Sequence, residues 1–499
     1  MNYLSIKNNQ RVALESIPTL AYEVFYHEVV THLMTGEDAH CVNYFGIPSG
    51  KEVKLICCIA SDALGTIQVV ATLADPEKMI PSLSSKIMAF HAFEREIHEN
   101  FGIQYVDHPW LKPIRYPFDR ATKQCQISNY PFYKIESEEL HEVGVGPIHA
   151  GVIEPGHFRF ICNGEQILHL EIQLGYQHRG LEHLFVEKKG LLQRATLAEN
   201  IAGDTVVGHT STFANVWESL CGFTASEKLQ FDRALALEHE RIAIHTGDLS
   251  AICTDVAYQL GSSVFGRLRT PVINYFQQWC GNRLAKSLIR PGKTNFPSTP
   301  QLAEKWFEVF HAYEPHFTEM ALQMFDLPSV LSRIEKTGVV SRETALDIGA
   351  VGMAARASGL KRDVRSSHPT GYYEKTSYQP IMGQVGDVHA RSKIRFDEIN
   401  TSIAFIKNML NQMPQPDGEI KPLDSPAPGS FVLSMTEGWR GEICHCAITG
   451  SKGELLLYKI KDPSFHNWLA LALAVRNNEI SDFPICNKSF NLSYCGHDL

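Results

Sequence analysis

A long helical pattern, from Leu181 to about Ile289, separates two regions of alternating strand pattern. Within it, Thr224-Ala-Ser-Glu227 resembles a capping box that opens a helix running through FDRALALEHERIAIHTGDL. Residues 301–415 continue largely helical, the segment FVLSMTEGWRGEICHCAITGSKGELLLYKIK returns to alternation, and HNWLALALAVRNNEI forms a last helix. The order predicts a bundle of long helices flanked by β-structure.

The first part of the chain has a different pattern. Residues 40–75 alternate and are rich in β-branched types, which predicts a small meander of strands. Ile87, Phe90, Phe93 and Ile97 then recur at helical spacing until Gly102. The Pro-rich stretch that follows predicts a boundary between a small α+β domain, 1–135, and a large domain, 136–499, so the fold class is α+β. Asn163-Gly164, between two alternating runs, predicts a hairpin with a type I′ turn.

Charge and hydropathy exclude several classes of protein. The chain has 499 residues with 46 Lys and Arg against 55 Asp and Glu, a formal net charge of −9, so no basic excess points to nucleic acid. Its longest apolar runs, such as Trp468 to Val475, fall far short of the roughly 20 residues that cross a bilayer. The first residues contain no apolar segment typical of a secretion signal, and we expect a cytoplasmic protein.

The 12 cysteines contain no C-x-x-C pair. Thiolate metal sites usually take two ligands from one tight turn, so their spacing is short. The pair Cys444 and Cys446 would share one face of a strand, and small buried thiols are a better interpretation of it than a metal site. We therefore expect no metal on this chain.

Several motifs, in order, resemble subunits of NADH:quinone oxidoreductase, respiratory complex I. Glu94-Arg95-Glu96, Phe101-Gly102-Ile103 and His108-Pro109 look like its C-type peripheral-arm subunit, with Glu99 in place of the usual Asp. The motifs of the rest of the chain look like the D-type large subunit. They are GPIHAGVIEPGHFRF from Gly146, His178-Arg179-Gly180 with Glu182, ARASGLKRDVR from Ala355, GDVHAR from Gly386 and RGE from Arg440. The fusion, and EPGHFRF, are closer to formate-hydrogenlyase-type membrane-associated nickel-iron hydrogenases.

The resemblance implies a nickel-iron hydrogenase large-subunit-like fold in the large domain. It also implies partners: a small iron-sulfur subunit, which would hold a 4Fe-4S cluster, and antiporter-like integral membrane subunits. This chain would be peripheral on the inner face of the cell membrane, coupling electron transfer or conformational change to ion translocation. A non-redox scaffold in a transporter-like membrane complex is the alternative. Electron donor, electron acceptor and transported ion are left open.

Two sets of cofactor ligands of the family are absent. The four thiolates that hold nickel and iron align with Ala202, Thr205, Ser493 and Gly496, none of which suits a soft metal centre. The quinone-binding histidine and tyrosine of complex I align with Pro155 and Gly203. His149 and His157 lie in the same loop and stay open as substitutes. We expect no cofactor bound by this chain and no self-contained hydrogenase activity.

By the same resemblance, a set of polar residues should converge on the vacated cavity. Buried charges of this kind must be paired, and such a network either braces the fold or relays protons, with histidine as the natural carrier. The sequence leaves both roles open. The candidate residues are Glu154, His157, Arg159, His209, Arg356, Asp363, Arg365 and Arg440.

Overall fold

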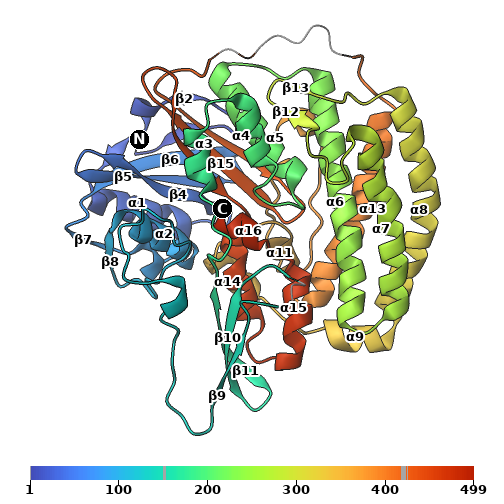
Figure 1. Ribbon diagram of the computed structural model, residues 1–499, viewed down its shortest axis with the longest axis horizontal. Coiled ribbons are helices and arrows are strands. Elements are labelled where there is room, and N and C mark those ends of the chain that lie inside the picture. The colour runs from blue at the N-terminus through green and yellow to red at the C-terminus, as the bar shows by residue number, and fades with distance from the viewer. Residues whose placement is uncertain (1, 150–152, 417–422, 424) are drawn as a thin grey trace.

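The computed structural model describes residues 2–149, 153–416, 423 and 425–499, and it confirms the α+β class. The N-terminal part lies on one side of the molecule and the helix bundle on the other, with a second sheet between them (Figure 1). The N-terminal elements are β1 (Leu4–Ile6), β2 (Val12–Ala13), β3 (Thr19–Leu20), α1 (Tyr22–Met34), β4 (Ala39–Ser49), β5 (Glu52–Ser61), β6 (Thr66–Ala74), β7 (Met79–Pro81), α2 (His91–Phe101) and β8 (Gln104–Val106).

A long connection leads from β8 to the large part of the chain, and the predicted boundary near residue 135 falls within it. The elements that follow are β9 (His141–Val145), β10 (His157–Asn163), β11 (Gln166–Gln173), α3 (Leu181–Glu187), α4 (Leu191–Ala198), α5 (Val206–Cys221), α6 (Glu227–Asp255), α7 (Gln259–Cys280), β12 (Ile289–Arg290), β13 (Lys293–Thr294), α8 (Pro300–Asp326) and α9 (Pro328–Ile334). The remaining ones are α10 (Arg342–Asp347), α11 (Gly352–Ala357), α12 (Val364–Ser367), α13 (Val388–Leu410), β14 (Ser430–Glu437), β15 (Glu442–Thr449), β16 (Leu455–Lys461), α14 (Ser464–Ala474), α15 (Phe483–Phe490) and α16 (Tyr494–Asp498).

The N-terminal sheet has the order β1-β6-β5-β4, and β3 pairs with β6 in parallel. Its alternating side chains serve two cores, as the period of a strand requires. Tyr44 and Cys57 face α1 and α2, which cover one side. Val42 and Cys58 face the other side and pack against β14 and β15. The meander and the helix ending at Gly102, whose φ is 78°, are confirmed.

The two parts of the chain share structure as well as a core. The second sheet has the order β16-β15-β14-β2, so a strand from the first residues completes a sheet built from the last part of the chain. The face of this sheet opposite the N-terminal part packs against α5 through Phe213, Trp217 and Tyr458. Consequently, β14 and β15 are buried along their full length.

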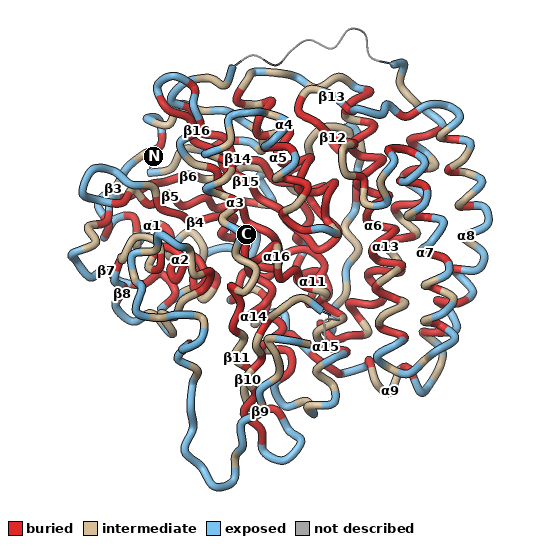
Figure 2. The backbone as a smooth tube through the Cα atoms, viewed as in Figure 1, coloured by how far each residue is buried: buried red, intermediate tan, exposed pale blue. Residues whose placement is uncertain are grey.

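The helix bundle consists of α6, α7, α8 and α13. The 29-residue helix α6 lies innermost and is buried over most of its length, whereas α7 and α8 expose their outer faces (Figure 2). Among the described residues, no helix is long and apolar enough to span a membrane. Helix α6 carries polar and charged side chains into the interior of the protein. Each of them needs a hydrogen-bond or ion-pair partner there.

Two local predictions were off by one or two residues. Helix α6 is capped by Ser226, whose Oγ accepts from the Leu229 backbone N–H at 3.0 Å, rather than by Thr224. The β10–β11 hairpin forms, but its turn is Gly164-Glu165, and only Gly164 (φ 57°) has positive φ, whereas type I′ requires it at both positions. Both differences are of the one or two residues by which the ends of helices and strands are commonly uncertain from local sequence.

Replacing a side chain in the shared core tests whether the two parts fold together. Leu433 on β14 is fully buried against the N-terminal sheet, so Leu433→Ala should lower the free energy of unfolding by about 2–5 kcal/mol. Chemical denaturation should still show one transition. Leu64→Ala, at a turn residue that is 73% exposed, is the control and should change little. Separate transitions for the two parts would contradict a shared core.

Candidate functional site

A network of buried ion pairs lies where α6, α11, α12 and α13 meet the end of β14. The guanidinium of Arg356 contacts Glu398 at 2.9 Å and Asp363 at 3.2 Å. Arg365 contacts Asp363 and Glu398, each at 2.7 Å. Asp363 also caps α12 by accepting from the Arg365 backbone N–H at 3.0 Å. Three of the predicted residues therefore lie together in the interior.

Helix α6 completes the network from the bundle side. Arg365 reaches Glu238 at 3.1 Å, and Arg241 lies 3.3 Å from Glu238 and 3.7 Å from Glu398. His245, one turn further along α6, contacts Glu398 at 2.9 Å. Burial opposes the charge on Glu398, but the surrounding guanidinium groups outweigh it and lower the pKa of Glu398 well below its usual range.

Glu437, the last residue of β14, is the fourth carboxyl of this cluster. It accepts from Arg356 at 2.7 Å and from the Val364 backbone N–H at 3.1 Å. Three guanidinium groups face four carboxyl groups here, and burial lowers the pKa of His245, so the carboxyl groups outnumber the permanently charged basic groups by one. Burial, together with repulsion from Asp363, raises the pKa of Glu437 to about 7. Near neutrality this carboxyl can hold or release a proton.

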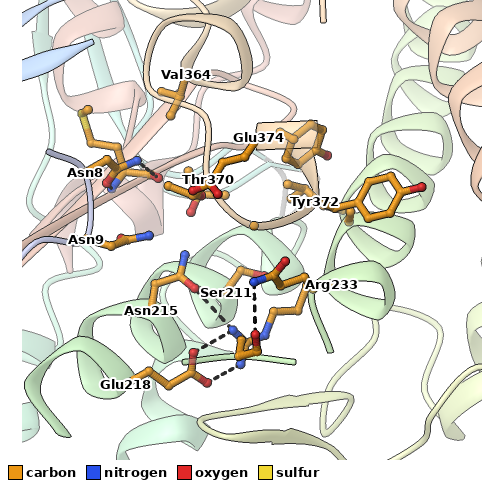
Figure 3. A pocket seen from close by; sticks show the side chains of 18 of the residues that line it. Asn8, Asn9, Ser211, Asn215, Glu218, Arg233, Val364, Thr370, Tyr372 and Glu374 are labelled. Carbon is orange, nitrogen blue, oxygen red and sulfur yellow. Dashed lines mark hydrogen bonds and ion pairs between the residues drawn. The ribbon is translucent and has the colours of Figure 1, made fainter. Parts of the chain in front are cut away.

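A pocket of about 240 Å³ lies beside this cluster, and Glu437 is among the residues that line it. Exposed Thr224 and Glu374 lie at its mouth, and buried Glu437 and Arg365 lie at its base. Figure 3 shows the polar wall of the pocket, where Arg233 contacts Glu218 at 2.9 Å and Asn215 at 3.3 Å.

Three other polar groups of the same wall have no partner in the part of the chain that the structure describes. The Ser211 and Thr436 hydroxyls and the Asn9 Oδ1 are buried without a hydrogen-bond partner among the described residues. A polar, roomy pocket with such groups suits water. The network is therefore in reach of solvent protons through this pocket.

His209 belongs to a second, separate chain of polar groups. Its Nε2 lies 3.0 Å from Asp462 and its Nδ1 lies 3.1 Å from the Nε2 of His445, whose Nδ1 contacts the Tyr458 hydroxyl at 2.8 Å. Burial, followed by the His209 ring, lowers the pKa of His445 well below its usual range. This arrangement connects α5 to β15 and β16 through buried imidazoles.

Arg440 forms a third cluster at the positions that align with metal ligands. Its guanidinium binds both oxygens of Asp204, at 2.6 and 2.7 Å, and the Thr205 hydroxyl at 3.0 Å. Ser493 is already used as the N-cap of α16, accepting from the Gly496 backbone N–H at 2.9 Å. A Cβ at Gly496 would lie 2.8 Å from the Asp462 carboxylate and 2.9 Å from the Ser493 Oγ. The residues present therefore do not fit a nickel-iron centre.

Glu154 and Cys495 border the same place. Burial, and next the negative charge of Glu154, raises the pKa of Cys495 to about 11, so this thiol is protonated at neutral pH. Among the described residues, no group of three or more His, Cys, Asp or Glu side chains is arranged to hold a metal ion. Through its contact with Cys495, Glu154 lies next to the aligned ligand positions Ser493 and Gly496.

The cysteine pair on β15 behaves as two buried thiols. Cys444 and Cys446 share one face, with their sulfur atoms 3.9 Å apart, and both are buried in the core between the two sheets. Burial, before any other cause, raises the pKa of both thiols well above the usual range. Neutral thiols are poor metal ligands.

His157 and Arg159 do not join the other candidates, which corrects their predicted placement. They lie on β10, where Arg159 contacts Glu142 of β9 at 3.0 Å and the His157 ring packs 5.1 Å from Phe132. Strand β10 pairs with β9 and β11, so its polar side chains point to the open side of a hairpin rather than into the interior. The candidates therefore form the Arg356 network, the His209 chain, the Arg440 cluster with Glu154, and this hairpin.

Apart from Asp363, sequence reasoning missed the carboxylate partners of the predicted basic residues in these clusters. Glu238, Glu398 and Glu437 carry the network, and Asp204 and Asp462 carry the other two clusters. Glu238 and Arg241 lie three residues apart inside a stretch of α6 with buried residues on every face. Charged residues within an otherwise fully buried helix are the signal that would have found them.

Comparison with known proteins places the chain in a family. Residues 19–130 match the model described as respiratory-chain NADH dehydrogenase, 30 Kd subunit, and residues 261–427 match the one described as respiratory-chain NADH dehydrogenase, 49 Kd subunit. The chain is a fusion of these two units and belongs to the complex I and hydrogenase-related family, as the motifs predicted. The Arg356 network lies within the 49 Kd match, apart from its residues on α6 and β14.

Curated relatives span most of the chain and come from both branches. The carbon monoxide-induced hydrogenase of Rhodospirillum rubrum is 26% identical over 70% of this chain and 97% of its own length. Formate hydrogenlyase subunit 5 of Escherichia coli is 26% identical over 86% of this chain and 78% of its own. The fused C/D-type protein of the NADH-quinone oxidoreductase of Phocaeicola vulgatus is 26% identical over 77% and 79%.

Restoring a thiol at the last ligand position should destabilise the protein. Gly496→Cys forces a Cβ against Asp462, and we expect a loss of about 1–3 kcal/mol in the free energy of unfolding. Gly203→Ala is the matched control, because Gly203 is exposed and has no atom near its Cβ position. Denaturation curves measure both. Equal stability of Gly496→Cys and the unmodified chain would show that the ligand position is still open.

Proposed function

We propose that this chain is the peripheral-arm large subunit of a membrane-associated oxidoreductase complex related to NADH:quinone oxidoreductase and energy-converting hydrogenases. It couples electron transfer or conformational change to ion translocation without a nickel-iron centre of its own. The fused 30 Kd and 49 Kd matches and the relatives named as hydrogenases and NADH-quinone oxidoreductases support this role. They favour it over a scaffold without redox function.

The proposed surroundings follow from the same family. One 4Fe-4S cluster is held by a small partner subunit, antiporter-like membrane subunits form the translocating arm, and this chain docks at the inner face of the membrane. A hydrogenase large-subunit-like arrangement of the long helices agrees with the bundle of α6, α7, α8 and α13. One relative, from Pyrococcus furiosus, is named membrane-bound hydrogenase subunit alpha.

The single observation that carries the coupling role is the excess carboxyl Glu437 at the base of a solvent-connected pocket. When Glu437 gains or loses a proton, the charge balance of Arg356 and its partners changes. Arg440 lies three residues after Glu437, within the turn Gly438–Gly441 that follows β14. Gly441 packs so closely on Gly352, at the start of α11, that a Cβ on Gly352 would lie 2.1 Å from the Gly441 Cα. A change in the network is thereby transmitted to the Arg440–Asp204 cluster.

The composition of the native complex tests the subunit role. The chain, tagged at its own locus and extracted with mild detergent, should co-purify with a small iron-sulfur protein and polytopic membrane proteins, identified by mass spectrometry. Elemental analysis should find iron with that partner and no nickel on this chain. A native pool found entirely as a cytosolic monomer contradicts the subunit role, and about one nickel per chain contradicts the missing centre.

Glu437→Gln tests the proton-handling role in the assembled complex. The amide keeps the volume and an acceptor for Arg356 but cannot titrate. Because the pKa of Glu437 is about 7, wild-type ion translocation should change between pH 6 and 8. The variant should be slower by about tenfold or more and flat across this range. Translocation is measured in reconstituted vesicles after assembly has been verified.

Glu94→Gln is the matched control for that experiment. Glu94 is equally buried, and burial also raises its pKa to about 7, but it lies in the N-terminal part and is held by Ser82, Ser84 and the Leu83 backbone. Its variant should keep the wild-type pH profile. A Glu437→Gln complex that assembles and retains the wild-type pH profile would leave Glu437 as a bracing residue only.

A further inference from the structure

A second, larger cavity of about 640 Å³ lies between the N-terminal part and the large part of the chain. Its walls come from α2, from residues 109–114, from β11 and from α14, which lie next to one another in Figure 1. This volume falls within the range of small-molecule sites, which often form where two units meet. Neither the ion-pair network nor the Arg440 cluster contributes to its walls.

The walls of the cavity are mainly apolar. Trp110 and Leu111 line one side, and Phe465, Trp468 and Leu473 line the other. Such a surface suits a hydrocarbon or aromatic body rather than a polar sugar or a phosphate.

Arg95 places a positive charge at this apolar cavity. The residue is only 8% exposed, its Nε donates to the Lys112 carbonyl at 2.8 Å, and its Nη2 donates to the Pro113 carbonyl at 2.7 Å. Its Nη1 has no hydrogen bond and the guanidinium has no carboxylate partner within the described ranges. A buried charge of this kind is costly unless a counter-ion neutralises it.

Of the other charged residues that line the cavity, Asp347 and Arg476 are exposed to solvent, and the half-buried Lys112 and Glu171 pair with each other. Glu171 also accepts from the Tyr130 hydroxyl at 3.1 Å and the Tyr133 backbone N–H at 2.7 Å. Burial, and then the charge of Arg95, lowers the pKa of His91 well below its usual range, so this imidazole stays neutral. Its Nδ1 is buried without a partner among the described residues.

We propose that this cavity binds an amphipathic carboxylate, with its carboxylate on Arg95 and its apolar body between Trp110 and Trp468. The anion supplies the counter-ion that Arg95 lacks, and the body covers apolar wall that would otherwise face water. Neutral His91 adds a hydrogen-bonding group beside the carboxylate. The site is independent of the proposed function, since it shares no residue with the Glu437 pocket.

Titration of the purified full chain with decanoate tests the proposal, with the fluorescence of the lining tryptophans as the signal. Saturable binding of decanoate is expected, whereas decanol and decylamine, which share the tail but lack the negative charge, should bind at least tenfold more weakly. Arg95→Gln should weaken decanoate binding by about ten- to hundredfold, the range of a charge-assisted hydrogen bond. Arg159→Gln removes a cation outside the cavity and should bind as the unmodified chain does.

A second variant separates ligand binding from loop folding, because Arg95 also holds the carbonyls of residues 112 and 113. Leu473→Trp fills the cavity from α14 without touching Arg95, and it should abolish binding while the far-ultraviolet circular dichroism is unchanged. Decanol binding as tight as decanoate, or decanoate binding retained in both variants, would overturn the proposal. Binding to the isolated chain that vanishes in the intact complex would also overturn it, in favour of a partner segment in the cavity.

Discussion

The paired contact of Arg356 and Arg365 with Glu398 holds the large part of this protein together. These side chains come from α11, α12 and α13, and through Glu238 and Glu437 they reach α6 and β14. Removing one member of a buried pair leaves the other charge without compensation, at a cost of about 3–5 kcal/mol. The network therefore fixes how the helix bundle meets the second sheet. That sheet in turn binds the N-terminal part through the shared core of β5 and β14.

Polar contacts hold together the two segments in which the family resemblance would place metal ligands. Arg440 with Asp204 joins the start of α5 to the β14–β15 turn, and Ser493 caps α16 where a thiolate would otherwise be needed. At Gly496 the Asp462 carboxylate lies so close that a side chain would force it to move. The polar groups thus keep the two segments together without metal. Fold alone does not imply function, so the side chains at these positions, rather than the fold, carry the proposal that this chain has no nickel-iron centre.

The elements of this protein were largely predictable, and the pairing of its charges was not. Periodicity located β4 to β6, α2 ending at Gly102, the long bundle helices and the last three strands, because each pattern reports a local face. The contacts of Arg365 with Glu398 and Glu238 had no local signal, since these residues lie 33 and 127 positions away from Arg365 in the chain. His157 was misplaced because resemblance gives the loop it occupies but not which side of a hairpin faces the interior.

Three buried carboxyls with raised pKa differ in what surrounds them. Burial raises the pKa of Glu94 to about 7 and of Glu240 to about 8, and in each case backbone N–H groups donate to the carboxyl: those of Leu83 and Ser84 to Glu94, and those of Val207 and Gly208 to Glu240. These backbone N–H groups supply the hydrogen bonds that each buried carboxyl needs. Glu437 accepts from one backbone N–H, that of Val364, and from one guanidinium, that of Arg356, and it differs from the other two in its place in an ion-pair cluster and beside a polar pocket. A titratable group in excess of the guanidinium groups is what a proton-handling site needs, and it is on this difference that the proposed role of Glu437 rests.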